Sequence, residues 1–73
     1  MGIDLTVGDK VYVHTKGTVM TVEDIILPGD QHRTSINWAD VDHGGEFVVL
    51  KLARQLDDYR ETLTVTANEV SIW

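Results

Sequence analysis

The amino-acid sequence predicts an all-β fold in which about five short antiparallel strands form a small barrel or sandwich. In several segments apolar residues alternate with threonine or charged residues, which is the period of a half-buried strand. Turn signals separate these segments every eight to twelve residues. The 73 residues are predicted to be one domain, residues 1–73. With one helix at most, we expect the sheet to close on itself and so bury its apolar face and its edges.

Two strands are predicted near the start of the chain. A Gly-Asp turn at 8–9 precedes a strand over residues 11–14, in which two valines alternate with a tyrosine and a histidine. A Lys-Gly turn at 16–17 precedes a second strand over residues 19–27. Strict alternation in this second strand places Ile25 on one face and three apolar side chains on the other, Met20, Val22 and Ile26.

A third strand is predicted over residues 33–39, after a Pro-Gly loop at 28–32. Ile36 and Trp38 lie on one face of this strand. The segment 40–45 then forms a tight connection, because its Gly-Gly pair can adopt the positive φ angles that short hairpin turns require.

The segment 46–61 is compatible with two structures. The run 47–52 has the β-branched and aromatic character of a strand, which Phe47, Val48 and Val49 give it. A helix would instead gather one apolar stripe, Val49, Leu52, Ala53, Leu56 and Tyr59. The sequence favours a long β-hairpin that turns at Asp57-Asp58. The alternative is a strand that passes into a short helix within residues 50–60. On either interpretation a strand at 62–66, a tight turn at 67–70 and a short closing strand complete the chain.

The segment VGDKVYVHTKGTVMTVEDI is similar to the opening of the YodC-like family, which consists of small uncharacterised bacterial and prophage proteins. That family begins with a Gly-Asp-x-Val strand, a glycine-containing turn and a Met-Thr-Val strand. Trp38 and Val70 resemble later positions of the family, and the resemblance covers about half of the chain. It implies a small SH3-like antiparallel barrel. The family has no established activity, so the resemblance supplies no catalytic residues.

Composition restricts the classes of partner. Twelve acidic residues against six basic ones give a formal net charge of −6, which disfavours contact with a phosphate backbone. A nucleic-acid-related role, through DNA binding or acidic mimicry of DNA, stays open as an alternative. The sequence contains no cysteine, which excludes disulfides, cysteine zinc sites and thiol catalysis. Because no signal peptide and no window of 18 apolar residues is visible, we expect a cytoplasmic protein without membrane contact.

No catalytic constellation stands out, and we expect a protein that is not an enzyme and needs no cofactor. Ser35 and Ser71 lack the glycines of a nucleophile elbow, and adjacent acids such as Asp57 and Asp58 point to opposite faces of a strand. One polar segment partly resembles a calcium loop through four side chains, Asp40, Asp42, His43 and Glu46. The remaining ligands of such a loop are missing. A solvated turn is the simpler interpretation, and a small metal- or ligand-binding domain is a further alternative.

The aromatic residues indicate a protein-interaction module. Aromatic-lined grooves are a common way for small β domains to bind peptides. Trp38 is also expected in the core, as a tryptophan in so small a protein usually is. Trp73 is expected to cap the barrel or to pack against a second subunit, so the chain would form a homo-oligomer or bind another protein. The predicted partner-binding residues are Tyr12, Trp38, Tyr59 and Trp73.

Overall fold

The computed structural model describes residues 4–39, 41 and 46–73. These residues form an all-β structure in which every paired strand runs antiparallel to its neighbour. Its elements are β1 (Asp4–Thr6), β2 (Lys10–Val13), β3 (Thr18–Leu27), β4 (Gln31–Arg33), β5 (Ser35–Asn37), β6 (Val49–Gln55), β7 (Arg60–Thr66), the 3-10 turn η1 (Ala67–Glu69) and β8 (Val70–Ile72).

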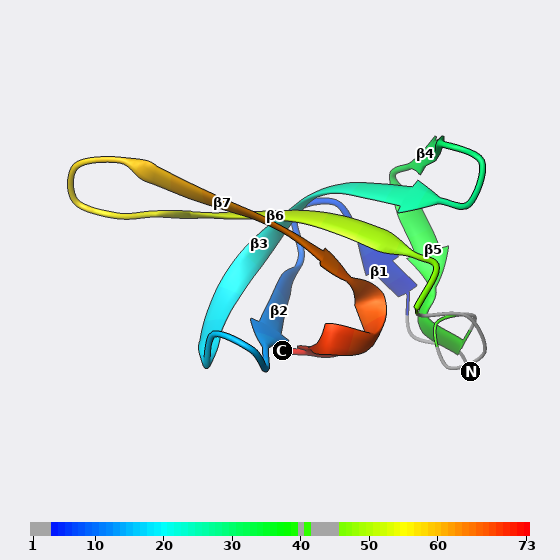
Figure 1. The fold of residues 1–73 in the computed structure, drawn as a ribbon, viewed down its shortest axis with the longest axis horizontal. Coiled ribbons are helices and arrows are strands. Elements are labelled where there is room, and N and C mark those ends of the chain that lie inside the picture. The colour runs from blue at the N-terminus through cyan, green and yellow to red at the C-terminus, as the bar shows by residue number, and fades with distance from the viewer. Residues whose placement is uncertain (1–3, 40, 42–45) are drawn as a thin grey trace.

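The strands are arranged in one large and one small sheet. The large sheet has the order β7-β6-β3-β2-β8, and β4 pairs with the end of β3. The small sheet pairs β1 with β5. The β6–β7 hairpin crosses the molecule and extends beyond the other strands (Figure 1). This order brings β2 and β8, which are far apart in the sequence, into direct contact.

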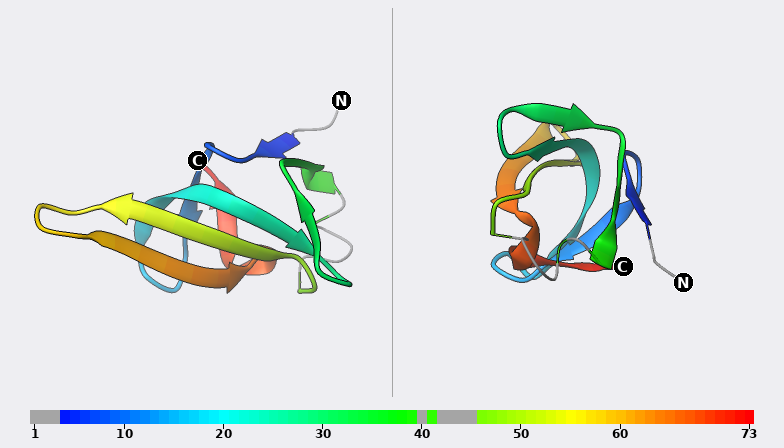
Figure 2. Two further views of the ribbon diagram at one scale, coloured as in Figure 1. Left: turned by 90° about the horizontal axis from the view of Figure 1, so that it is seen from above. Right: turned by 90° about the vertical axis from the view of Figure 1, so that its right-hand side faces the viewer.

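The large sheet bends around a common interior but does not close. Its strands surround this interior in the right-hand view of Figure 2. Strands β7 and β8 are the two ends of the sheet, and no pairing joins them among the described strands. The expectation of a closed barrel is therefore wrong in this respect. The chain passes from β7 to β8 through η1, where the Ala67 N–H donates to the Val48 carbonyl at 2.8 Å, so that a turn spans the place where a closing ladder would lie.

A β-bulge in β3 changes which side chains enter the core. The register between β3 and β6 shifts between Val22 and Asp24, where β3 has one extra residue. An extra residue reverses the alternation of faces beyond it. Ile25 is consequently fully buried and Ile26 is half-buried. The prediction that grouped Ile26 with Val22 is wrong, because strict alternation does not allow for a bulge.

The predicted strand over residues 33–39 is divided in two. β4 pairs with β3, whereas β5 leaves β3 and pairs with β1, a strand that the sequence did not predict. Between them the Thr34 carbonyl accepts a hydrogen bond from the Val7 N–H at 2.8 Å. The backbone becomes helical at Trp38, so this residue does not continue the strand. The predicted connection over residues 40–45 lies outside the described residues, except for Val41.

The segment 46–61 forms the predicted hairpin. Its register pairs Val49 with Thr66 and Gln55 with Arg60, and the Leu56 N–H donates to the Tyr59 carbonyl at 2.8 Å across the turn. The turn lies at Asp57 and Asp58, as predicted. The alternative of a short helix within residues 50–60 is wrong, since β6 continues to Gln55 and the remaining residues form the turn and the start of β7.

The core lies between the inner faces of the bent sheet and is closed by Leu5 of β1. Removing such side chains from water is the main favourable term in the folding of a small domain. The buried apolar residues in the described part of the chain are Leu5, Val11, Val13, Met20, Val22, Ile25, Val41, Val48, Leu50, Leu52, Ala53, Val65, Ala67 and Val70.

Candidate partner-binding surface

Two aromatic side chains share the outer face of the β2–β8 ribbon. In β2, Val11 and Val13 are buried, so Tyr12 between them points outward. Ser71 lies directly opposite Tyr12 in the register of β2 and β8. Trp73 is two residues beyond Ser71 and therefore lies on the same face, diagonal to Tyr12. The pairing of the two strands thus brings together two of the four predicted partner-binding residues.

Tyr12 and Trp73 stack against each other at the surface. Their ring centroids are 6.3 Å apart and their planes differ by 20°. Such offset stacking holds two large rings in a defined geometry. Trp73 nevertheless remains 72% exposed, and the structure therefore shows a tryptophan that neither caps the interior nor is covered by the described part of its own chain. We call Tyr12, His14 and Trp73 the aromatic face.

His14 completes this face and fixes its position relative to β8. The ring of His14 packs edge-on to Tyr12, with centroids 5.3 Å apart and planes at 78°. The Nε2 atom of His14 lies 2.6 Å from the Ser71 Oγ atom, and the two share a hydrogen bond. The His14 N–H donates to the Glu69 carbonyl at 3.0 Å. The Tyr12 ring thus contacts both His14 and Trp73.

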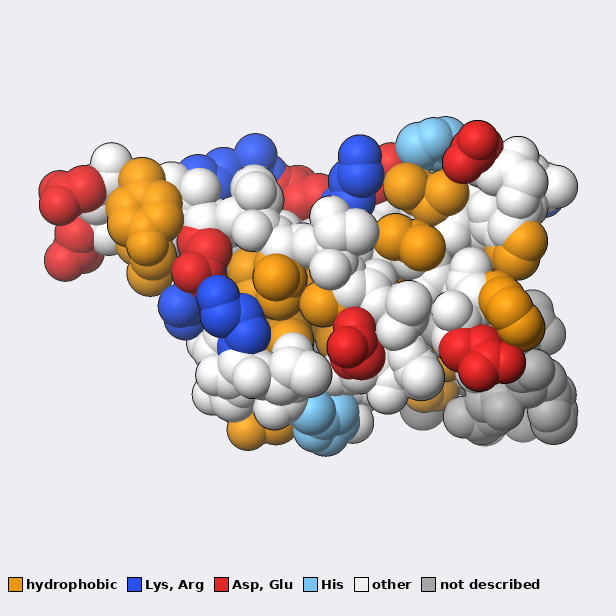
Figure 3. Space-filling view, in the orientation of Figure 1, with side chains coloured by type: hydrophobic (Ala, Val, Ile, Leu, Met, Phe, Trp, Pro, Cys, Tyr) orange, Lys and Arg blue, Asp and Glu red, His pale blue; other side chains and the backbone are white. Residues whose placement is uncertain are grey.

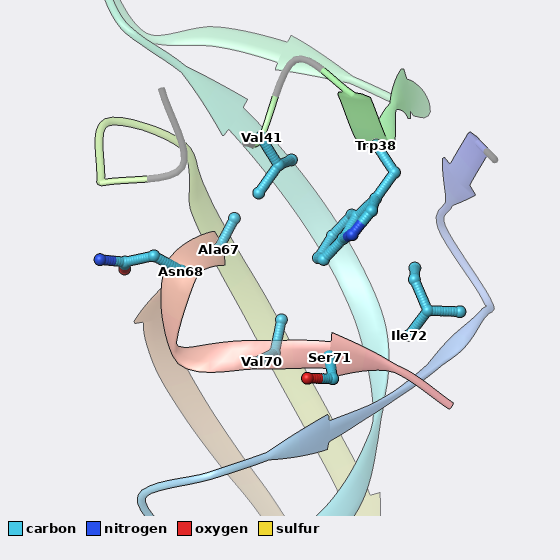
Figure 4. A pocket seen from close by; sticks show the side chains of 7 residues that line it. All are labelled: Trp38, Val41, Ala67, Asn68, Val70, Ser71 and Ile72. Atoms are coloured by element: carbon cyan, nitrogen blue, oxygen red, sulfur yellow. The ribbon is translucent and has the colours of Figure 1, made fainter. Parts of the chain in front are cut away.

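Trp38 lies on the opposite side of β8, in a groove of about 500 Å³. The side chains of Val70 and Ile72 point from β8 toward Trp38, whereas Ser71 points away (Figure 4). Trp38 is partly buried and packs against the hydrophobic core. We call this the β8 groove; it is lined by Trp38, Val41, Ala67, Asn68, Val70, Ser71 and Ile72. The expected core role of Trp38 is therefore met in part, since one side of its ring faces the groove.

Tyr59 is not part of either surface. It lies in the turn between β6 and β7, at the tip of the hairpin that extends beyond the other strands (Figure 1), and it is 58% exposed. Of the four predicted partner-binding residues, the fold thus brings Tyr12 and Trp73 into contact, places Trp38 behind them across β8, and separates Tyr59 from all three.

The best-developed charge cluster lies where the β6–β7 hairpin leaves the core. Glu61 accepts hydrogen bonds from Lys16 Nζ at 3.2 Å and from Arg54 Nε at 2.7 Å. These two cations, Lys16 first, hold the pKa of Glu61 below its ordinary value. Arg54 also donates to Thr18 Oγ1 at 2.8 Å. Every member already has a partner within the chain, and the cluster therefore fixes the base of the hairpin.

A second ion pair lies on β3 and β4. The Nδ1 atom of His32 is 2.7 Å from the Asp24 Oδ2 atom. This hydrogen bond, more than the nearby positive charges, holds the pKa of Asp24 below its ordinary value. On the face shown in Figure 3, acidic and basic side chains alternate along the hairpin and only the tip is uniformly acidic. This face therefore carries no continuous basic stripe.

The described residues bring no three potential metal ligands together. His14 is bonded to Ser71 and His32 to Asp24, on different strand pairs. Of the four residues that partly resemble a calcium loop, Asp40, Asp42 and His43 lie outside the described residues, and Glu46 is exposed. No helix in the part that the structure describes is long and apolar enough to cross a membrane.

No family model, curated protein or solved structure matches this chain. The resemblance to the YodC-like family therefore stays a prediction. The candidate surface rests on the geometry of the described residues alone.

Sequence reasoning missed the polar residues around Trp73. Asp4, Asp9 and Lys10 line a second cavity beside its ring. It also missed His14 as part of the aromatic face. The sequence did carry a signal for it, because His14 is two residues after Tyr12 in the predicted strand and so lies on the same face. The position of Asp4 depends on β1, and so short a strand shows no alternating pattern in the sequence.

Proposed function

We propose that this chain is a non-enzymatic protein-interaction module whose aromatic face binds a segment of a partner protein. The observation that carries the proposal is the exposure of Trp73 in a fixed stack with Tyr12. Large exposed aromatic side chains cost solubility, and at protein interfaces tyrosine and tryptophan contribute more binding free energy than most residues. Their stacking reduces the conformational entropy that binding must remove.

The arrangement of strands supports an SH3-like architecture for this module. Strands β2 and β3 form a two-stranded ribbon, and β3, β6 and β7 form a meander. The 3-10 turn η1 then leads into the last strand, β8, which pairs with β2. The β8 groove and the aromatic face lie on the two faces of that last strand.

The net charge of the chain supports a protein partner over two other classes. A net charge of −6 repels the phosphates of nucleic acid and also repels a second copy of the chain. The predicted homo-oligomer is a separate outcome. Light scattering in the experiment below detects it, because a dimer of this chain forms without any added peptide.

Selection from a random peptide library displayed on phage tests this function. We expect binders whose affinity falls at least about tenfold for Trp73→Ala, because exposed tryptophans at binding sites are frequent hot spots. Tyr59→Ala is the matched control, because Tyr59 is similarly exposed but lies at the hairpin tip. Its affinity should stay within about twofold of the wild type.

The same experiment can overturn the proposal. Binders that tolerate Trp73→Ala and depend on Tyr59 would place the surface at the hairpin tip. A selection without any Trp73-dependent binder, together with a dimer in light scattering that Trp73→Ala dissociates, would replace partner binding by self-association. Catalytic turnover abolished by a single Asp or His substitution would contradict the non-enzymatic assignment.

A further inference from the structure

A cavity of about 260 Å³ lies beside the exposed ring of Trp73. Its wall combines three kinds of chemistry. Trp73 supplies an aromatic surface, Ile72 supplies apolar contact, and three charged residues complete the lining. The residues around it are Asp4, Leu5, Asp9, Lys10, Ile72 and Trp73. We call it the Trp73 pocket. Its volume is that of a site for one side chain and is smaller than most sites for small molecules.

The carboxylate of Asp9 is held in position at this pocket. Its Oδ2 atom accepts a hydrogen bond from the Thr6 N–H at 2.9 Å, and the Asp9 N–H donates to the Thr6 carbonyl at 2.9 Å. Asp4 is held through its backbone, because β1 pairs it with Asn37 of β5. Two acidic residues, Asp4 of β1 and Asp9 of the turn before β2, thus line the pocket, together with the single cation of Lys10.

This combination suits a cation with an apolar stem. The face of a tryptophan ring attracts lysine or arginine head groups, and carboxylates form charge-assisted hydrogen bonds with them. Half-buried Ile72 can contact the methylene groups of such a side chain, whereas Leu5 is fully buried beneath it. The net charge of −6 draws a basic segment toward the chain from a distance.

We propose that the Trp73 pocket receives a lysine or arginine side chain of the segment that the aromatic face binds. This inference rests on the proposed function and specifies the chemistry of the partner as basic. Lys10 is the cation among the residues that line the pocket, and its charge opposes that of a bound lysine or arginine. Its removal should therefore strengthen binding, whereas neutralising Asp4 or Asp9 should weaken it.

Three synthetic peptides test the proposal directly: acetyl-Gly-Gly-Arg-Gly-Gly-amide, its lysine counterpart and its citrulline counterpart. Citrulline has nearly the shape of arginine but no charge. Titration of the full ¹⁵N-labelled chain, followed at the indole N–H of Trp73, should show saturable binding of the two cationic peptides. The citrulline peptide should bind about tenfold more weakly. Raising the salt concentration from about 50 mM to about 500 mM should weaken the cationic peptides and leave the citrulline peptide unchanged.

Charge variants give the second arm of the test. Asp4→Asn and Asp9→Asn should each weaken the arginine peptide severalfold, and Lys10→Gln should tighten it. Asp9→Asn keeps an oxygen that can accept the Thr6 N–H, which preserves the loop. Asp58→Asn at the hairpin tip is the control for net charge, because it removes the same charge far from the pocket. Equal binding of citrulline and arginine peptides, or equal effects of Asp4→Asn and Asp58→Asn, would overturn the inference.

Failure of this inference can be told apart from failure of the proposed function. Selected peptides that depend on Trp73 but contain no basic residue would refute the cationic pocket and leave the interaction module intact. Absence of any Trp73-dependent peptide would refute the aromatic face as the binding surface.

Discussion

Tyr12 of β2 and Trp73 at the end of β8 stack at the surface with their ring planes 20° apart. The contact joins segments that are far apart in the sequence, and it exists because β8 returns to pair with β2 after η1. The contact also leaves most of Trp73 in solvent, where folding gains little from it. We therefore expect Trp73 to contribute little to stability, in agreement with the binding role proposed for it.

Trp73→Ala should therefore cost little stability. The expected loss is about 0.5–1.5 kcal/mol, the contribution of a stacked aromatic pair. Urea unfolding followed by circular dichroism measures it. Tyr12→Ala should cost more, because Tyr12 is less exposed and also contacts His14. A loss above about 3 kcal/mol for Trp73→Ala, in the range of core truncations, would show that Trp73 is a core residue.

Because of the bulge in β3, we expect truncation of two neighbouring isoleucines to cost different amounts of stability. Ile25→Val should cost about 0.5–1.5 kcal/mol, because it removes one methyl group from the fully buried side. Ile26→Val should be nearly neutral. The free energies of unfolding of the two variants, measured in urea, show which isoleucine faces the core. A larger loss at Ile26 than at Ile25 would mean that β3 alternates without a bulge.

Glu61 should make the domain acid-sensitive. Lys16 and Arg54 lower the pKa of Glu61 in the folded state, so its charge stabilises the fold above the unfolded pKa of about 4. This stabilisation is lost as the pH falls through the lower, folded pKa. Glu61→Gln should reduce stability at pH 7 and flatten the decline below pH 4.

The control for Glu61 is Asp57→Asn in the exposed hairpin turn. Thermal midpoints of both variants, measured between about pH 2 and pH 7, separate the specific cluster from the general loss of negative charge. Parallel acid profiles for wild type and Glu61→Gln would contradict a stabilising role of the cluster.

The ion pair between His32 and Asp24 predicts a measurable change in a single pKa. In His32→Ala the pKa of Asp24 should rise toward its ordinary value, because its hydrogen bond with the His32 ring is its largest stabilising contact. Titration of the Asp24 carboxyl carbon by NMR measures this shift directly. An unchanged pKa would mean that the Ile25 N–H and Lys51 hold the carboxylate on their own.

The parts of the fold that the sequence predicted are those with a strong local signal. Alternation over residues 11–14 predicted a strand, and the structure buries Val11 and Val13 on one face of it. The sequence favoured a hairpin that turns at Asp57-Asp58 and left a helix open, and the register of β6 and β7 confirms the hairpin. The resulting all-β antiparallel structure follows from such patterns. The bulge in β3 and the β1–β5 pair have no such local signal in the sequence, because both depend on contacts with distant strands.

The candidate surface was predicted residue by residue rather than as a surface. Aromatic type alone selected Tyr12 and Trp73, which the fold brings into contact. It also selected Tyr59, which lies at the tip of the hairpin, away from them. Only the register of β2 and β8 decides which of these side chains meet. Asp4 and Asp9 could not be chosen from the sequence, since many exposed acids look alike until β1 is placed.

Chemical-shift mapping tests the central claim most directly. A peptide selected from the library is titrated into the ¹⁵N-labelled chain, and the perturbed backbone amides are assigned. We expect the largest changes on residues 9–14 and 70–73, with Tyr12 and Trp73 among them. Changes concentrated on residues 55–60 at the hairpin tip, with β2 and β8 unaffected, would contradict it.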